Sequence, residues 1–242
     1  MQINIGDFKN IVFFDTETTG FSGEKDRIIE LAAILVNADG TKEMDEFIRL
    51  PEGQSIPEEI VALTHITDEM LLNQGKSEEE VMEMFGELIS GEKTLLVAHN
   101  AQFDLNFVGW TAARHRKNHP EWIRDIAKAD YLDTLTVYKD RRAYPHKLAN
   151  AIEAYNLADK VQNSHRAVDD CRALMEVAIA MEKERPDLAK YVNIFGYNPK
   201  YGPSGSRYNK IKYLPHGSRS YMALVEQTLY SIAKAYDDPQ KR

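Results

Sequence analysis

The segment Phe13–Gly20, FFDTETTG, places two acidic residues one position apart at the end of an apolar run. Side chains alternate between the two faces of a strand, so Asp15 and Glu17 project from the same face, roughly 7 Å apart along the backbone. Two carboxylates at such a separation repel each other unless a proton or a cation lies between them. The segment therefore predicts a buried strand that carries one half of a cation site.

The residues around this strand predict an α/β fold. Segments 11–14, 28–36 and 43–50 have strand patterns and short connections, which favours an antiparallel meander. Two further short strands are expected at 94–99 and at 128–133, the second ending near Asp133. Helices are expected to begin near Pro57, Thr67, Ser77, Gln102, Thr134, Leu148 and Arg166. A meander followed by alternating helices and strands indicates a mixed five-stranded sheet flanked by helices.

Length and composition limit the class of protein. A chain of 242 residues, 43% of them hydrophobic, is long enough for one well-buried domain plus an extension. The single cysteine, Cys171, cannot form an internal disulfide, and no Cys/His spacing resembles a zinc site. The N-terminal residues 1–10 lack the pattern of a signal peptide, and no segment approaches the roughly 20 apolar residues that span a bilayer. We therefore expect a soluble cytoplasmic protein with no membrane partner.

Charge is unevenly distributed along the chain. The formal net charge of −8 would by itself argue against a nucleic-acid partner. From Lys183 onward, however, there are 11 Lys and Arg against 5 Asp and Glu, and the stretch 196–219 has no acidic residue but several interleaved tyrosines. We predict a domain at 1–185 and a basic, tyrosine-rich appendage at 186–242, with a final helix near 221–236. The basic stretch either contacts nucleic acid or packs against the acidic body.

A third acidic residue faces inward in the segment LVAHNAQFDLNFV. Asp104 lies in the first turn of the expected helix, where its i+3 and i+4 neighbours are Phe107 and Val108. An inward carboxylate needs a partner, and no lysine or arginine occurs between Lys93 and Arg114. A local ion pair is therefore not expected.

The fourth acidic residue comes from the segment SHRAVDDCRALMEV, which offers Asp169 or Asp170. If the helix begins near Arg166, Asp170 shares its face with apolar residues, whereas Asp169 shares its face with Arg166 and Arg172. Asp170 is therefore expected on the core side, and it is the candidate ligand.

Four carboxylates would thus point to one place from three separate elements: Asp15, Glu17, Asp104 and Asp170. Without partners they could not all ionise, and two divalent cations roughly 4 Å apart would suit in-line phosphoryl displacement. Oxygen ligands favour Mg²⁺ or Mn²⁺ over zinc. His165, five positions before Asp170, is expected to lean over the same cleft and take the proton from an attacking water.

The three segments DTETTG, HNAQFD and HRAVDD, in this order, resemble the exonuclease motifs of the DEDDh, or DnaQ-like, 3′–5′ exonucleases. That family includes the proofreading epsilon subunit of bacterial DNA polymerase III and the exonuclease domain of the Gram-positive replicative polymerase. The resemblance covers about 10–183. It implies an RNase H-like fold, two metal ions held by the four carboxylates, and His165 as the general base.

The resemblance also implies an activity and substrate contacts. Single nucleotides would be removed from a 3′ end, with Thr18 and Thr19 near the terminal sugar and His65 and Phe107 near the terminal nucleotide. DNA is the expected substrate, in proofreading or repair, and trimming of RNA 3′ ends is the alternative. A polymerase or a sliding clamp is a candidate partner, although an ordinary amphipathic helix explains the clamp-like segment QTLYSI, 227–232, better.

Three residues near the motifs have structural interpretations. Glu30, inside the second strand, is expected to be a structural acid paired with a basic group such as Arg27. His99 and Asn100 are expected to hold the loop before Asp104.

A binding module on a decayed nuclease fold is the non-enzymatic alternative, and the retention of all four acids and the histidine argues against it.

Overall fold

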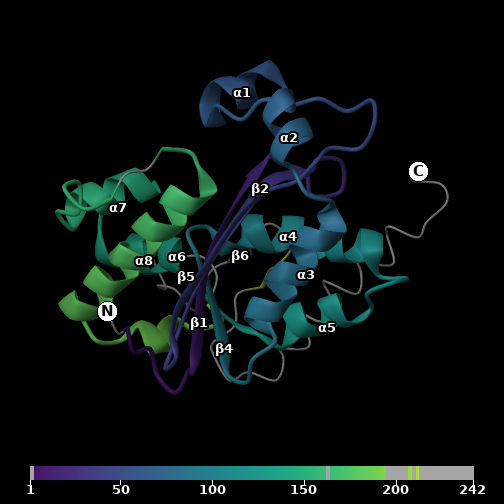
Figure 1. Ribbon diagram of the computed structural model, residues 1–242. Coiled ribbons are helices and arrows are strands. Elements are labelled where there is room, and N and C mark those ends of the chain that lie inside the picture. Colours follow the sequence, from purple (N-terminus) through teal and green to yellow (C-terminus); the bar gives the residue numbers. More distant parts are fainter. Residues whose placement is uncertain (1–2, 162–163, 195–206, 209–210, 213–242) are drawn as a thin grey trace.

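The computed structural model describes residues 3–161, 164–194, 207–208 and 211–212. Within these residues a twisted five-stranded sheet crosses the molecule, with strand order β3-β2-β1-β4-β5 (Figure 1). The strands are β1 (Asn10–Thr18), β2 (Ile28–Asn37), β3 (Gly40–Phe47), β4 (Thr94–Ala98) and β5 (Asp130–Asp133). The predicted α/β fold with a mixed five-stranded sheet is confirmed.

Strands β1, β2 and β3 form the predicted antiparallel meander, and β4 and β5 join it in parallel. Strand β1 extends to Thr18, four positions beyond the predicted end, so both acids of the opening segment lie within it. They stay in the sheet because β2 pairs with them: Asp15 is opposite Ala32 and Glu17 is opposite Glu30. A shift in register between Glu17 and Thr18 ends the regular pairing.

Helices cover both faces of the sheet. The helices are α1 (Glu58–Thr64), α2 (Asp68–Gln74), α3 (Glu78–Ile89), α4 (Ala101–His115), α5 (Glu121–Lys128), α6 (Thr134–Arg141), α7 (Leu148–Ala154) and α8 (Ala167–Glu184), followed by a 3-10 turn, η1 (Leu188–Tyr191). One core lies between the sheet and α3, α4 and α5, and a second lies between the sheet and α6, α7 and α8. Both faces of the central strands are therefore covered, which explains the nearly continuous burial along β2.

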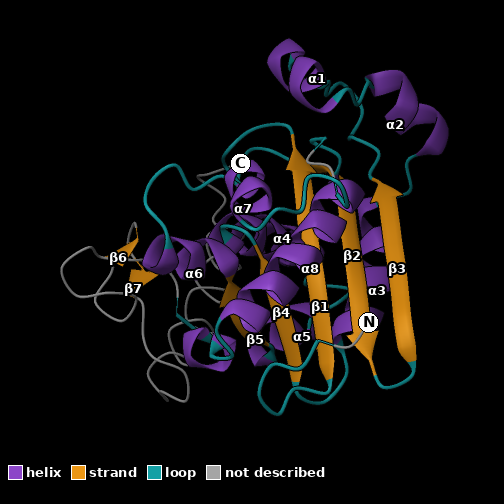
Figure 2. Ribbon diagram, turned by 90° about the vertical axis from the view of Figure 1, so that its left-hand side faces the viewer, coloured by secondary structure: helices purple, strands orange, loops and turns teal. Residues whose placement is uncertain are grey.

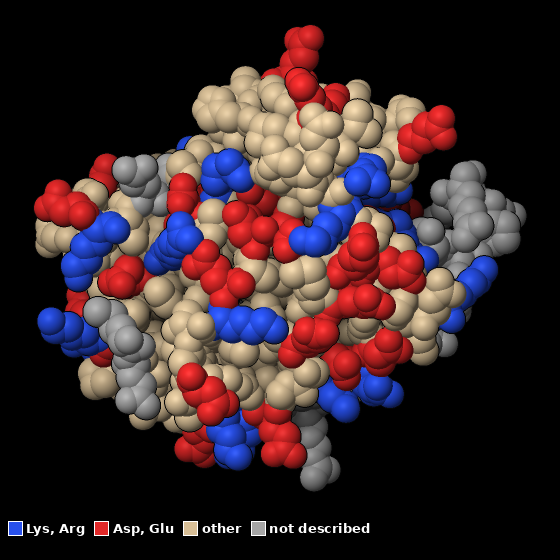
Figure 3. All heavy atoms as spheres, viewed as in Figure 1, with Lys and Arg blue, Asp and Glu red and all other residues tan. Residues whose placement is uncertain are grey.

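Helices α1 and α2 stand apart from these two layers. They form a lobe beyond the end of the sheet toward which β1 points (Figure 2). A small separate core, formed by Ile29, Ile56, Ile66 and Leu71, holds the lobe to β2. On the face shown in Figure 3 the lobe is mostly uncharged, and below it acidic and basic side chains are interspersed.

The expected helix starts agree with the caps in the structure. Ser77 and Glu80 form the predicted capping box at α3, and the side chain of Thr67 accepts a hydrogen bond from the Met70 amide at α2. Helix α5 was not predicted from the sequence. Pro120 immediately precedes it, a helix-start signal, and Trp122 and Ile126 are its buried side.

The compact body continues past the predicted boundary at 185. Leu188 and Val192 are buried completely, and the Asn193 side chain accepts a hydrogen bond from the Tyr131 amide of β5 at 2.8 Å. Residues 186–194 therefore belong to the body, because they cover the edge of β5. Most of the predicted basic appendage and its final helix lie outside the described residues. Among the described helices, none is both long and apolar enough to cross a membrane.

Candidate active site

The candidate site lies at the carboxyl end of β1, where α4 and α8 begin on opposite faces of the sheet (Figure 2). Asp15 and Glu17 come from β1, Asp104 comes from the first turn of α4, and Asp170 comes from the first turn of α8. His165 lies just before α8. These elements are distant in sequence, and the sheet topology brings their ends together.

Asp104 links α4 to β1 through hydrogen bonds. Its Oδ1 accepts hydrogen bonds from the Thr16 amide at 3.1 Å and from the Thr16 hydroxyl at 2.8 Å. Burial raises the pKa of Asp104 to about 7, although the bonds from Thr16 act in the opposite direction. The inward direction predicted for Asp104 is confirmed, since its side chain is almost completely buried.

Glu17, His165 and Asp170 form the second part of the site. Each offers a ligand atom, and these atoms all lie within 4.8 Å of one another. Burial, and then the charge of Asp170, raises the pKa of Glu17 to about 8. His165 is exposed, so it reaches this cluster from the solvent side. Two carboxylates and an imidazole at these distances fit a divalent cation.

Asp15 joins the two parts of the site. Burial raises its pKa well above the usual range of a carboxyl group, and the charges of Asp104, Asp170 and Glu17 raise it further. All four acids are therefore close enough to influence one another, and without a cation the site must hold protons. Oxygen donors of this kind suit Mg²⁺ or Mn²⁺.

The structure distinguishes the two adjacent acids of α8 as predicted. Asp170 is buried, with 6% of its surface exposed, and Asp169 is half-exposed. Asp169 accepts a hydrogen bond from the Ser164 hydroxyl at 2.7 Å and lies 3.5 Å from Arg172. Arg166 is half-exposed like Asp169, and its guanidinium binds Glu30 of β2.

Glu30 is paired with a basic group as expected, although that group is not the suggested Arg27. Its carboxylate binds Arg166, from the start of α8, and not Arg27. The Arg27 guanidinium donates to the backbone carbonyls of Lys25 and Asp26 instead. Glu30 points to the face of the sheet that α8 covers, so its positively charged partner is Arg166 at the start of that helix.

The two threonines after Glu17 shape the turn that leaves β1. The Thr18 hydroxyl donates to the Gly20 carbonyl at 2.6 Å, and the Thr19 hydroxyl accepts from the Arg27 amide at 2.9 Å. His65 is exposed at the end of α1, with a left-handed backbone (φ 59°). Thr18 and Thr19 therefore lie in the turn directly after Glu17, and His65 lies at the surface of the lobe.

Phe107 does not lie where the resemblance implied. It is completely buried in the core between the sheet and α4, and its ring contacts that of Phe103 at 4.9 Å between centroids. A side chain without exposed surface cannot contact a nucleotide. Its position one turn after Asp104 on the inward face explains the burial, so we assign it to packing.

An apolar groove beside the turn that follows Glu17 was not predicted from the sequence. It has a volume of about 560 Å³, lies between the loop 19–26 and α1, and is lined in part by Thr19, Ile60 and Leu63. Phe21, in its wall, is 87% exposed. A large aromatic residue directly after the DTETTG segment was the available signal.

His99 holds the loop before α4 as expected. One ring nitrogen is 3.0 Å from the Thr134 hydroxyl, and the other is 2.9 Å from the His146 carbonyl. Asn100 precedes α4 in a left-handed conformation, and its backbone amide donates to the Asp133 carboxylate. Both residues therefore have structural contacts.

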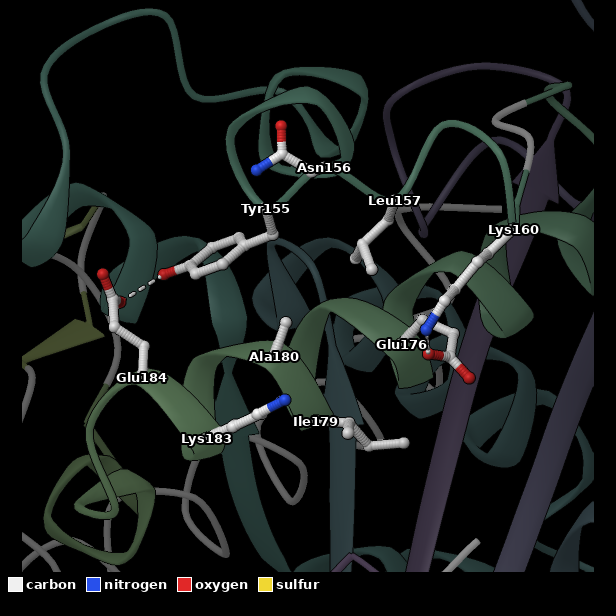
Figure 4. A pocket seen from close by; sticks show the side chains of 9 residues that line it. All are labelled: Tyr155, Asn156, Leu157, Lys160, Glu176, Ile179, Ala180, Lys183 and Glu184. Carbon is white, nitrogen blue, oxygen red and sulfur yellow. Dashed lines mark hydrogen bonds and ion pairs between the residues drawn. The ribbon is translucent and has the colours of Figure 1, made fainter.

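A second hollow, of about 600 Å³, lies between the end of α7 and the outer side of α8 (Figure 4). Tyr155, Leu157 and Ile179 contribute to its wall, and the Tyr155 hydroxyl donates to Glu184 at 2.9 Å. None of the acids described above lines it. It is separate from the candidate site.

The raised pKa values predict how pH and metal affect stability. Between about pH 4, the ordinary carboxyl pKa, and about pH 8, the folded protein binds more protons than the unfolded chain, because Glu17 titrates at about 8 and Asp104 at about 7. The free energy of unfolding of the metal-free protein should therefore fall as pH rises through this window. Saturating Mg²⁺ should raise Tm most at the alkaline end, where the protons have left. Thermal melts at several pH values, with EDTA and with Mg²⁺, measure both effects, and a Tm shift equal at all pH values would contradict the expectation.

Known proteins with similar sequences are exonucleases or DNA polymerase III chains. The exonuclease family RNase_T matches residues 12–178. The chain is 33% identical over 168 residues to the DNA polymerase III subunit epsilon of Treponema pallidum, covering 69% of this chain and 74% of that protein. It is also 33% identical over 193 residues to the PolC-type DNA polymerase III of Clostridium perfringens, covering 78% of this chain and 12% of that protein.

Solved structures of exonuclease I have a similar fold. The Escherichia coli enzyme in complex with a dA16 oligonucleotide superposes with a TM-score of 0.62 at 18% identity, over 75% of this chain and 42% of the other. The enzyme from Methylocaldum szegediense gives a TM-score of 0.62 at 21% identity, over 74% and 42% of the two chains. The chain therefore spans less than half the length of these structures. At this identity the likeness shows the fold, which is the RNase H-like exonuclease fold.

Proposed function

This chain belongs to the exonuclease family, and on that basis we propose that it removes nucleotides one at a time from the 3′ end of single-stranded DNA by two-metal phosphodiester hydrolysis. The observation that carries the proposal is the convergence of four carboxylates and a histidine at the end of β1: Asp15, Glu17, Asp104, Asp170 and His165. Two of the carboxyl groups have pKa values near or above neutrality, as expected of a site built to receive cations.

Each part of the site has a role in the proposal. The four carboxylates would hold two Mg²⁺ or Mn²⁺ ions, which would stabilise charge on the attacking and leaving oxygens of a phosphodiester. His165 takes the proton from the attacking water, and its exposed position lets it pass that proton to solvent. Thr16 keeps Asp104 in place through its two hydrogen bonds.

The surroundings of the acids suit a 3′-terminal nucleotide. Thr18 and Thr19, at the turn after Glu17, lie near its sugar in this proposal, and His65 approaches from α1. The apolar groove beside them, with Phe21 in its wall, offers surface for a base.

DNA is the favoured substrate. The relatives named above are DNA polymerase III chains, and one of the similar structures holds a DNA oligonucleotide. RNA is the alternative, since discrimination would depend on the 2′-hydroxyl. A proofreading or repair role, with a polymerase as partner, follows from the same relatives.

The test is degradation of matched oligonucleotides by the full chain. With a 5′-labelled single-stranded DNA and Mg²⁺ we expect a ladder of products shortened from the 3′ end, and no products with EDTA. A 3′-labelled copy should release labelled mononucleotide first. Faster degradation of the matched RNA would favour the alternative substrate, and products shortened from the 5′ end would contradict the polarity.

A further inference from the structure

Glu30 stands next to the candidate site but takes no part in the proposed chemistry. It lies opposite Glu17 in the pairing of β2 with β1, so both side chains project from the face of the sheet that α8 covers. Like charges directly opposite each other on adjacent strands are unfavourable. The two acids have different neighbours: Glu17 lies with His165 and Asp170, whereas Glu30 binds Arg166.

Both oxygens of Glu30 are used by the start of α8. Oε1 accepts from Nε of Arg166 at 3.0 Å and from its terminal nitrogen at 2.6 Å, and Oε2 accepts from the Ala167 amide at 2.8 Å. The Glu30 side chain has no exposed surface. The Arg166 guanidinium lies over the Phe47 ring of β3, 5.0 Å from the ring centre. A carboxylate from β2 thus replaces the local cap that α8 lacks.

These contacts determine where the first turn of α8 lies. Arg166 is the residue between His165 and the helix, and its carbonyl accepts the hydrogen bond from the Asp170 amide at 3.0 Å. His165 has a left-handed backbone, with φ of 56°, which residues other than glycine adopt when neighbouring contacts hold them. A shift of Arg166 would therefore move both His165 and Asp170.

We propose that Glu30 and Arg166 are positioning residues that hold His165 and Asp170 against Glu17, and that Arg166 also keeps Glu30 from acting as a fifth carboxylate of the cation site. This inference rests on the proposed function, since it assigns the pair to the same site. Groups that orient metal ligands without touching the metal commonly affect metal affinity and activity by about 10–100-fold.

A second ion pair provides a matched control. Arg172, further along α8, binds Glu43 of β3 at 2.5 Å, so it also joins α8 to the sheet through an arginine and a glutamate. Glu43 and Arg172 are both partly exposed, and the 3.5 Å contact of Arg172 with Asp169 does not depend on Glu43. Glu43→Gln therefore removes a connection of the same kind without moving His165 or Asp170. Val177→Ala weakens the buried side of α8 and supplies a control for lost stability.

The experiment measures Mn²⁺ binding calorimetrically on the full chain without nucleic acid, then kcat and KM on single-stranded DNA. For Glu30→Gln we expect Mn²⁺ affinity and kcat to fall about 10–100-fold with KM little changed. Glu43→Gln and Val177→Ala should keep both values at temperatures well below their Tm. If Glu30→Gln proves insoluble, Arg166→Lys, which keeps the charge but loses the two-pronged geometry, should show the same losses.

Two outcomes separate this inference from the proposed function. If Glu30→Gln lowers Tm as Val177→Ala does but retains wild-type Mn²⁺ affinity and kcat, the Glu30–Arg166 pair only stabilises the fold and the inference is overturned. If the wild type binds Mn²⁺ but degrades neither DNA nor RNA, the proposed function fails, while weaker Mn²⁺ binding by Glu30→Gln than by Glu43→Gln would still support positioning.

Discussion

Asp15→Asn is expected to abolish hydrolysis while leaving the fold intact. The charges of Asp104, Asp170 and Glu17 all raise the pKa of Asp15, so Asp15 lies near each of the other three acids. The amide keeps the shape of the side chain but removes one negative charge from the ligands. Loss of a group that stabilises charge in the transition state lowers kcat by about 10²–10³-fold or more. Initial rates on single-stranded DNA at saturating Mg²⁺ measure this loss.

Without metal, Asp15→Asn should be at least as stable as the wild type, although it has lost activity. Asp15 is held among other acids in the folded protein, and ionising it there is unfavourable, as its raised pKa indicates. Replacing it by a neutral amide removes that repulsion, so the Tm in EDTA should hold or rise. Asp39→Asn, the same change in the exposed β2–β3 turn, is the control and should alter neither activity nor Tm. Wild-type turnover in Asp15→Asn would refute the proposed metal site.

Asp170→Ala and Asp169→Ala should have opposite phenotypes although the residues are adjacent. Asp170 is buried and lies with Glu17 and His165, so its removal should lower kcat by about 10²–10³-fold. Asp169 contacts Ser164 and Arg172 on the outer side of α8, and its removal should leave most activity.

The pair of variants tests the orientation of α8 directly. Activity on single-stranded DNA and Mn²⁺ affinity, measured in parallel, should both fall for Asp170→Ala and both persist for Asp169→Ala. If the two variants exchanged phenotypes, Asp169 would be the ligand and the assignment of the inward face would be wrong. Equal loss in both would instead point to the Ser164–Asp169 contact as a further support of His165.

Local patterns in the sequence were sufficient for the five strands of the mixed sheet and for the faces on which the four acids lie. Strand alternation placed Asp15 and Glu17 on one face, and helical periodicity directed Asp104 inward and separated Asp170 from Asp169. These are properties of a few neighbouring residues, because the period of a strand or a helix decides which side chains share a face. Their convergence follows from the order of the elements, and the structure places them at one end of β1.

Only the tertiary structure decided the contacts between distant elements. Glu30 binds Arg166, 136 positions away, and not the nearby Arg27, because packing of α8 on the sheet brings that cation to the same face. Phe107 follows the same inward face as Asp104, yet it lies in the core and not in the site. Residues 186–194 join the body because the edge of β5 needs partners for its backbone groups. Periodicity assigns a face to each side chain, but what covers that face depends on segments far along the chain.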